Sequence, residues 1–165
     1  YIGFVDFGKD IEASCDPDTP ATEALFFSLV GLKVHWKTPI GYVFCNKIKT
    51  SNLNYFISKI LDVSFSFNIS IHSITFDGAQ TNFNSVLPFG ATFGRKIDDI
   101  KPNFIYNHLE HPIHIIPDPC HMLKLARNAL NDIGIFVFVD KDGKTILNYY
   151  SLALVVRMDL IIMLM

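Results

Sequence analysis

The chain has 165 residues, of which 50% are apolar and 18% charged, and its formal net charge is −2. This length suits a single domain with a sizeable core, and the apolar content argues against a disordered chain. The slightly negative charge excludes a global electrostatic attraction to nucleic acid. Any contact with DNA would therefore have to use a local basic patch.

The three cysteines, Cys15, Cys45 and Cys120, are widely spaced and form no C-x-x-C pair. This pattern supports neither a zinc ribbon nor a disulfide framework, and reduced thiols in an intracellular compartment are the simplest interpretation. The chain opens on Tyr1 without a recognisable signal peptide. We expect it to be a piece of a longer protein.

Three strands are predicted in the first part of the chain. Residues 1–7, YIGFVDF, are rich in strand-forming side chains, and a polar loop with two prolines follows at residues 9–20. Residues 24–32 form a continuous apolar run, which predicts a strand buried on both faces. With a third strand at residues 39–45, the short connections predict an antiparallel meander.

An amphipathic helix and a fourth strand are predicted next. Thr50, Ser51 and Asn52 can cap a helix start. The apolar residues that follow repeat at i, i+3, i+4, i+7 and i+8, which is one face of a helix: Leu53, Phe56, Ile57, Ile60 and Leu61. Residues 69–76 read as a strand, and a helix between two strands implies a parallel crossover.

The last part of the chain predicts two helices, one strand and one turn. A short helix is expected at residues 79–89, irregular structure at 96–111 and a short strand at 112–116. A helix is expected at 120–130, and a turn at 140–143. The side chains predicted on the buried side of the second helix are Met122, Leu123, Leu125, Ala126, Ala129 and Leu130.

The predicted order is β-β-β-α-β-α-β-α, which is that of a ribonuclease-H-like fold, although several other mixed α/β folds remain possible. The segment 151–165 is apolar but contains Arg157 and Asp159. It is shorter than the roughly 20 uninterrupted apolar residues that a membrane span requires.

The segment 69–82, ISIHSITFDGAQTN, contains the main candidate site residue. Asp77 follows an apolar strand, and open α/β sheets build their sites at the carboxyl ends of strands. Asp-Gly is also a common turn dipeptide. Taken alone, the segment therefore favours a structural role for Asp77.

Four sequence blocks together resemble the transposase family of the P element and its THAP-domain relatives. These blocks are GFVDFG at residues 3–8, EALFFSLVGLKVHWKTPIGYVFCNKI at 23–48, SITFDGAQTN at 73–82 and DPCHMLKLARNAL at 118–130. The resemblance covers about residues 1–146. It implies an incomplete ribonuclease-H-like domain, with a mixed sheet of about five strands and flanking helices. Residues 147–165 diverge from the family and are expected to be read-through sequence or part of a decayed copy.

In that family, three acidic residues bind two divalent metal ions that serve DNA cleavage and strand transfer, and clustered carboxylates hold such metals about 4 Å apart. Asp77 matches the second acidic position, so the resemblance implies that it is a catalytic residue and a ligand of Mg²⁺ or Mn²⁺. The first acidic residue lies upstream of the matched blocks and the third, a glutamate, lies beyond a GTP-binding insertion. Both are missing here, as is the THAP zinc domain, so the chain alone is expected to be inactive.

The resemblance also implies a parent protein that acts in the nucleus on transposon DNA, as a homo-oligomer and with GTP. Two other interpretations stay open. The chain could come from a domesticated or decayed relative that binds without catalysis. It could also be an unrelated α/β binding domain, which would require all four blocks to match by accident.

Three other polar residues have simpler interpretations. Asp6 lies on a strand, but the resemblance places it one strand after the first acidic position, which favours a structural role. Asp118 precedes a helix and is interpreted as a cap for the amides of His121 or Met122 in preference to a metal ligand. Asn82 is expected to cap or brace the Asp77 turn rather than to bind a ligand itself.

Basic and aromatic residues complete the candidates. His121, Lys124 and Arg127 fall three residues apart and could contact a phosphate of DNA or a nucleotide, although a solvated helix face explains them equally well. The pattern His108, His111, His114 in an irregular segment is a weak zinc signal. Trp36 and Lys37 are interpreted as packing and surface residues.

Overall fold

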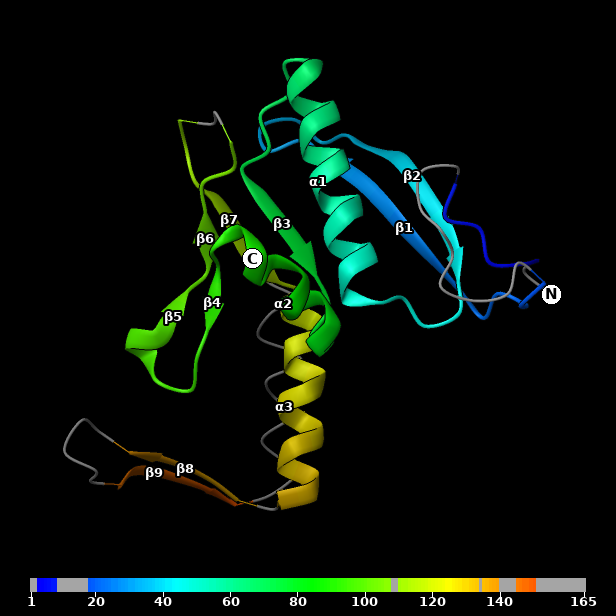
Figure 1. Cartoon of the computed structure of the whole chain (residues 1–165). Helices are drawn as coiled ribbons and strands as arrows, with labels where there is room; N and C mark the ends of the chain where they lie inside the picture. The colour runs from blue at the N-terminus through cyan, green and yellow to red at the C-terminus, as the bar shows by residue number, and fades with distance from the viewer. Residues whose placement is uncertain (1–2, 9–17, 108–109, 134, 140–144, 151–165) are drawn as a thin grey trace. The chain divides into compact units, whose positions relative to one another are not determined.

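The computed structural model describes residues 3–8, 18–107, 110–133, 135–139 and 145–150. The chain divides into two compact units, residues 1–66 and 67–165. Each unit is described by itself, and Figure 1 gives the element labels. The α/β class predicted from the sequence is confirmed, with the described strands distributed over four small sheets.

The first unit is built on an antiparallel hairpin. Strand β1 (Glu23–Val30) pairs with β2 (Lys37–Cys45), with an irregularity in the register between Phe27 and Ser28. The predicted first strand is reduced to two bridges, at Phe4 and Asp6. The Asp6 amide donates to the Phe44 carbonyl at 3.0 Å, so this segment pairs with β2 at that point. In the predicted meander it would have paired with β1 instead.

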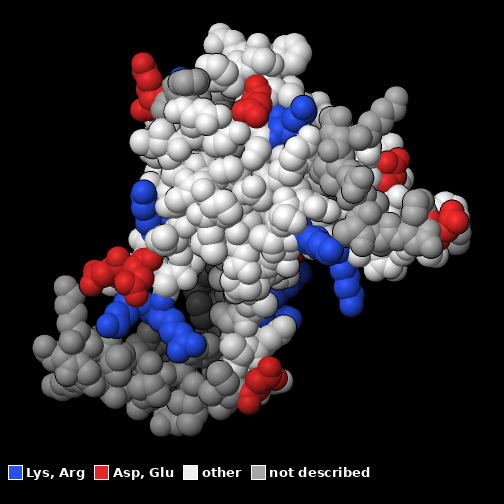
Figure 2. Space-filling model, in the orientation of Figure 1, with Lys and Arg blue, Asp and Glu red and all other residues white. Residues whose placement is uncertain are grey.

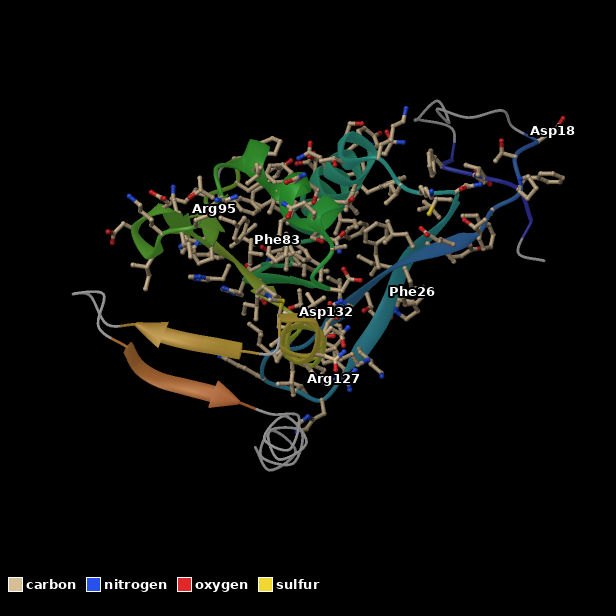
Figure 3. All side chains as sticks on the ribbon, turned by 90° about the horizontal axis from the view of Figure 1, so that it is seen from below. Asp18, Phe26, Phe83, Arg95, Arg127 and Asp132 are labelled. Carbon is tan, nitrogen blue, oxygen red and sulfur yellow. The ribbon has the colours of Figure 1, made fainter. Side chains whose placement is uncertain are left out.

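The prediction that the apolar run at residues 24–32 is buried on both faces is wrong. Burial alternates along β1, and Phe26 is 60% exposed (Figure 3). The opposite face of the strand carries Phe27, whose ring lies 5.9 Å from that of Phe56. A hairpin with a core on one face exposes every second side chain, however apolar the sequence is.

Helix α1 (Thr50–Ser66) confirms the predicted amphipathic helix. Leu53, Ile57 and Leu61 are buried, as the i, i+4 and i+8 spacing predicts. Phe56 packs against a core cluster of the same unit, which consists of Val5, Phe7, Ala21, Val43 and Cys45. Burial, and secondly the Glu23 carboxylate, raise the pKa of the Cys45 thiol.

The second unit contains a three-stranded sheet in the order β3-β7-β6. Strand β3 (Ser73–Phe76) is shorter than predicted and runs parallel to β7 (Ile113–Pro117), which pairs antiparallel with β6 (Asn103–Phe104). A parallel crossover therefore joins β3 to β7. The crossover predicted through α1 would lead from one compact unit to the other, and it stays a prediction.

A short helix and a 3-10 turn follow β3. Helix α2 (Gln80–Val86) continues into η1 (Leu87–Phe89), which confirms the predicted helix at residues 79–89. Gly90 ends it with a φ of 103°, a left-handed conformation that favours glycine. Phe89 stacks on the fully buried Phe104 with ring centroids 5.0 Å apart. The ring of Phe83, which is labelled in Figure 3, contacts that of Phe76 in the same unit.

Three strands of two residues each were not predicted: β6, which lies in the segment 96–111 that was expected to be irregular, and the pair that follows. Strands β4 (Thr92–Phe93) and β5 (Ile100–Lys101) pair antiparallel around η2 (Ile97–Asp99). The Thr92 hydroxyl donates to the Asp99 carbonyl and accepts from the Lys101 amide. Two-residue strands contain no repeat that a sequence pattern could reveal.

Helix α3 (Pro119–Ile133) confirms the predicted helix, but not its predicted buried side. Met122 is 39% and Leu125 40% exposed, and Ala126 is exposed as well. The side chain of Leu130 lies outside the described residues. The apolar stripe of α3 is therefore only partly covered within the part of the chain that the structure describes.

Strands β8 (Ile135–Val139) and β9 (Thr145–Tyr150) pair antiparallel. The predicted turn at residues 140–143 and the segment 151–165 lie outside the described residues. Within the described ranges, no helix is both long enough and apolar enough to cross a membrane.

Candidate functional site

Asp77 and Asp118 follow neighbouring parallel strands at the same edge of the sheet. The register pairs Phe76 with Pro117, the residues that immediately precede them. The Asp118 amide also donates to the Phe76 carbonyl at 2.8 Å. The carboxyl edge of β3 and β7 thus brings together two carboxylate residues that are far apart in the sequence, at the kind of edge where α/β proteins bind ligands.

The Asp77 side chain is solvent-exposed and is held through one oxygen. Its Oδ1 accepts hydrogen bonds from the Ala79 amide at 3.0 Å and from Asn82 Nδ2 at 2.6 Å. Among the described residues, no hydrogen bond is made to Oδ2. Asp77 therefore has the turn role that the Asp-Gly dipeptide predicted, through Oδ1. Its second oxygen, Oδ2, is open to a ligand.

Gly78 lies directly against helix α3. A Cβ atom at this position would overlap Leu125 Cδ1, and would lie 3.3 Å from His121 Cδ2 and 3.5 Å from Met122 Sδ. Only a residue without a side chain allows this approach at no cost. The Asp77–Gly78 turn and the beginning of α3 are therefore in close contact.

Asp118 is half-buried and begins helix α3. Its Oδ1 accepts a hydrogen bond from the Cys120 amide at 3.0 Å, and Pro119 occupies the first helical position. This geometry is that of a helix cap, although the bonded amide is that of Cys120 rather than of His121 or Met122 as expected. A cap bond leaves the second carboxylate oxygen uncommitted.

The three basic residues of α3 differ in their surroundings. His121 is half-buried and contacts the Gly78 turn, whereas Lys124 and Arg127 are exposed. Arg127 is labelled beside the helix, which is viewed almost along its axis in Figure 3. On the face shown in Figure 2, the described charged side chains are scattered among uncharged ones.

The histidine pattern of the sequence does not form a metal site within the described residues. His108 lies outside them, and no three potential ligands of the His, Cys, Asp or Glu type come together in the ranges that are described. Instead, His111 stacks on His72 with ring centroids 4.3 Å apart. The pairing of β3 with β7 brings these two rings together, so a local motif could not reveal the contact.

Asp6 and Trp36 have structural contacts. Asp6 Oδ1 accepts a hydrogen bond from the Gly8 amide at 2.8 Å, which closes a turn. The Gly31 amide donates to the Trp36 carbonyl at 3.0 Å, and the indole covers Gly31 so closely that a Cβ there would overlap it. Lys37 is exposed at the start of β2.

The parallel β3–β7 pair, the helices α2 and α3 that follow its strands, and the two carboxylates at its carboxyl edge define an α/β protein, and the family match makes it ribonuclease-H-like. The family described as TNP-like, RNase H N-terminal domain, matches residues 1–90, which is more than half of the chain. The chain belongs to this family.

Two known proteins agree with the resemblance seen in the sequence blocks. The DNA transposase THAP9 of Homo sapiens is 28% identical over 148 residues, which cover 84% of this chain and 15% of the relative. The solved structure of the Drosophila P element transposase strand transfer complex has a TM-score of 0.59 and 20% identity, and the match covers 87% of this chain and 29% of that one. The chain is thus a transposase-like domain that spans a small part of both proteins.

Proposed function

We propose that the chain is part of the catalytic core of a DNA transposase, in which Asp77 binds a divalent metal ion used for DNA cleavage and strand transfer. The observation that carries the proposal is the position of Asp77 at the carboxyl end of β3, with Oδ2 open to a ligand. Membership of the family and the similarity to a DNA transposase support it.

The donor chemistry fits the proposed metal. Carboxylate oxygens are hard ligands that suit Mg²⁺ or Mn²⁺, which are bound in phosphoryl-transfer sites by one or two carboxylates together with water and substrate oxygens. Asp77 would hold the ion. Asp118, at the end of the neighbouring strand, has a structural role as the cap of α3. When bound, such an ion activates the attacking oxygen and stabilises the leaving one.

The basic residues of α3 supply the proposed contacts with transposon DNA. His121 lies against the Asp77–Gly78 turn, and Lys124 and Arg127 follow on the same helix. Positive side chains at this place would neutralise the phosphates next to the metal, a contact that adds affinity without sequence specificity. We place the parent protein in the nucleus as a homo-oligomer, by its resemblance to the transposases.

The test is metal-dependent cleavage of transposon-end DNA by a full-length parent protein. The Asp77→Asn change should abolish cleavage in Mg²⁺, while Asp98→Asn, a change of an exposed carboxylate elsewhere in the same unit, should leave it intact. Because two of the family's three acidic positions are not matched in this chain, the 165-residue chain alone should not cleave. An Asp77→Asn parent that cleaves at the normal rate would contradict the proposal.

DNA binding is tested separately. Combined replacement of Lys124 and Arg127 by alanine should weaken the binding of the parent protein to DNA and lower its salt dependence. A wild-type parent that binds transposon DNA but does not cleave it, with or without Asp77, would favour the alternative of a domesticated or decayed binding module.

A further inference from the structure

Asn82 donates the shorter of the two hydrogen bonds that hold Asp77. Its Nδ2 lies 2.6 Å from Asp77 Oδ1, and the Ala79 amide lies 3.0 Å from the same oxygen. Both donors therefore converge on one oxygen rather than dividing between the two. Bonds of this kind to an ionised carboxylate are stronger than those between neutral groups, and together they restrict the rotation of the carboxylate.

Asn82 is itself fixed within helix α2. The backbone amide of Asn82 donates to the Ala79 carbonyl at 3.0 Å, and the backbone carbonyl of Asn82 accepts from the Ser85 hydroxyl at 2.7 Å. Ser85 and Val86 are fully buried and anchor the helix in the core of the second unit. The donor that orients Asp77 thus stands on a packed element, which is what a precise ligand geometry requires.

A second asparagine of the same helix, Asn84, has a different hydrogen-bond partner. Gln80 Nε2 donates to Asn84 Oδ1 at 2.9 Å, a contact between successive turns of α2. Asn84 is half-buried like Asn82, but no hydrogen bond joins it to Asp77 among the described residues. Asn84 therefore provides a matched control for the loss of one asparagine from α2.

We propose that Asn82 is a positioning residue for Asp77: together with the Ala79 amide it occupies Oδ1, so that a divalent cation is bound through Oδ2 alone. The inference rests on the proposed function, because it assumes that Asp77 is a metal ligand. Groups that orient a metal ligand commonly change metal affinity by about 10-fold to 100-fold when they are removed. If Asn82 served only to stabilise the start of α2, its removal would lower stability without a specific effect on the metal.

The test is calorimetric titration of the complete 165-residue chain with Mn²⁺. Wild type is compared with Asp77→Asn, Asn82→Ala and Asn84→Ala, and thermal unfolding of each variant is followed by circular dichroism. We expect Asp77→Asn to remove a Mn²⁺ site and Asn82→Ala to weaken that site by about 10-fold. Asn84→Ala should change its affinity less than about twofold, since its contact does not reach Asp77.

The outcomes separate the inference from the proposed function. An Asp77-dependent site whose affinity in the Asn82→Ala variant stays within about twofold of wild type would overturn the inference and leave the function standing. Equal binding by wild type and Asp77→Asn would overturn the metal assignment and the inference with it. If the Asn82→Ala variant does not fold, Asn82→Leu, which has a similar shape and no donor, is judged by the same thresholds.

Discussion

Replacing Asp77 should separate its role in the turn from its proposed role as a metal ligand. Asp77→Ala removes the acceptor of two hydrogen bonds, from the Ala79 amide and from Asn82. A typical intramolecular hydrogen bond contributes about 0.5–1.5 kcal/mol net, so the two together contribute about 1–3 kcal/mol. Because Asp77 is solvent-exposed, water can reach the released donors. We therefore expect a loss of about 1–2 kcal/mol, similar to the loss of a helix cap.

Asp77→Asn keeps an oxygen that can accept both hydrogen bonds and removes only the charge. Its cost should be about 1 kcal/mol or less, because the geometry is preserved and only the charge assistance is lost. The same change should abolish metal-dependent cleavage by the parent protein, since an amide is a poor ligand for Mg²⁺. We therefore expect Asp77→Ala to lose both stability and activity, and Asp77→Asn to lose mainly activity.

The assay is urea unfolding of the complete chain followed by circular dichroism at 222 nm. Fluorescence of Trp36, the single tryptophan, would report on the unit of residues 1–66, whereas Asp77 lies in the other unit. A loss above about 3 kcal/mol for Asp77→Ala would refute the reasoning that these are solvent-accessible hydrogen bonds. No measurable loss would show that the two bonds do not form in solution.

Three further predictions concern the core and the cysteines. Phe104→Ala should destabilise the second unit by about 3–5 kcal/mol, because it empties a fully buried site, and urea unfolding showing less than about 1 kcal/mol would contradict this. Gly78→Ala should cost about 1 kcal/mol by crowding Leu125, whose exposed end can move aside. Adding Leu125→Ala should remove that penalty in a double-mutant cycle, and a cycle with no coupling would refute the contact. Burial raises the pKa of the Cys45 thiol, so its reactive thiolate forms at higher pH than that of an ordinary thiol. Peptide mapping after iodoacetamide treatment should show Cys45 labelled after the exposed Cys120, with the difference shrinking as pH rises, and equal labelling at pH 7 would contradict this.

The elements with a regular repeat were predicted well. The five apolar positions of α1 lie on one face at helical spacing, and the helix forms over Thr50–Ser66. The apolar run before Asp77 does end in a strand, although only its last four residues, Ser73–Phe76, pair. These features depend on neighbours within a few residues, which is why a pattern could reveal them.

Burial was predicted less well, because it depends on what covers each face. The apolar run that became β1 was expected to be buried on both faces, yet Phe26 is largely exposed. Helix α3 has an apolar stripe, but Met122 and Leu125 remain more than one-third exposed. A side chain's hydrophobicity states what it would gain from burial, and only the packing partners decide whether it is buried.

The sequence by itself determined that a strand ends at a carboxylate and that a helix carries three basic residues soon after Asp118. The tertiary structure decided how these parts meet. Parallel pairing of β3 with β7 sets Asp77 and Asp118 at one edge, and the contact at Gly78 brings His121 to the same turn. It also decided that Asn82 bonds Asp77 Oδ1 and leaves Oδ2 open. Such contacts arise from sheet pairing and from side-chain geometry, which a one-dimensional pattern does not contain.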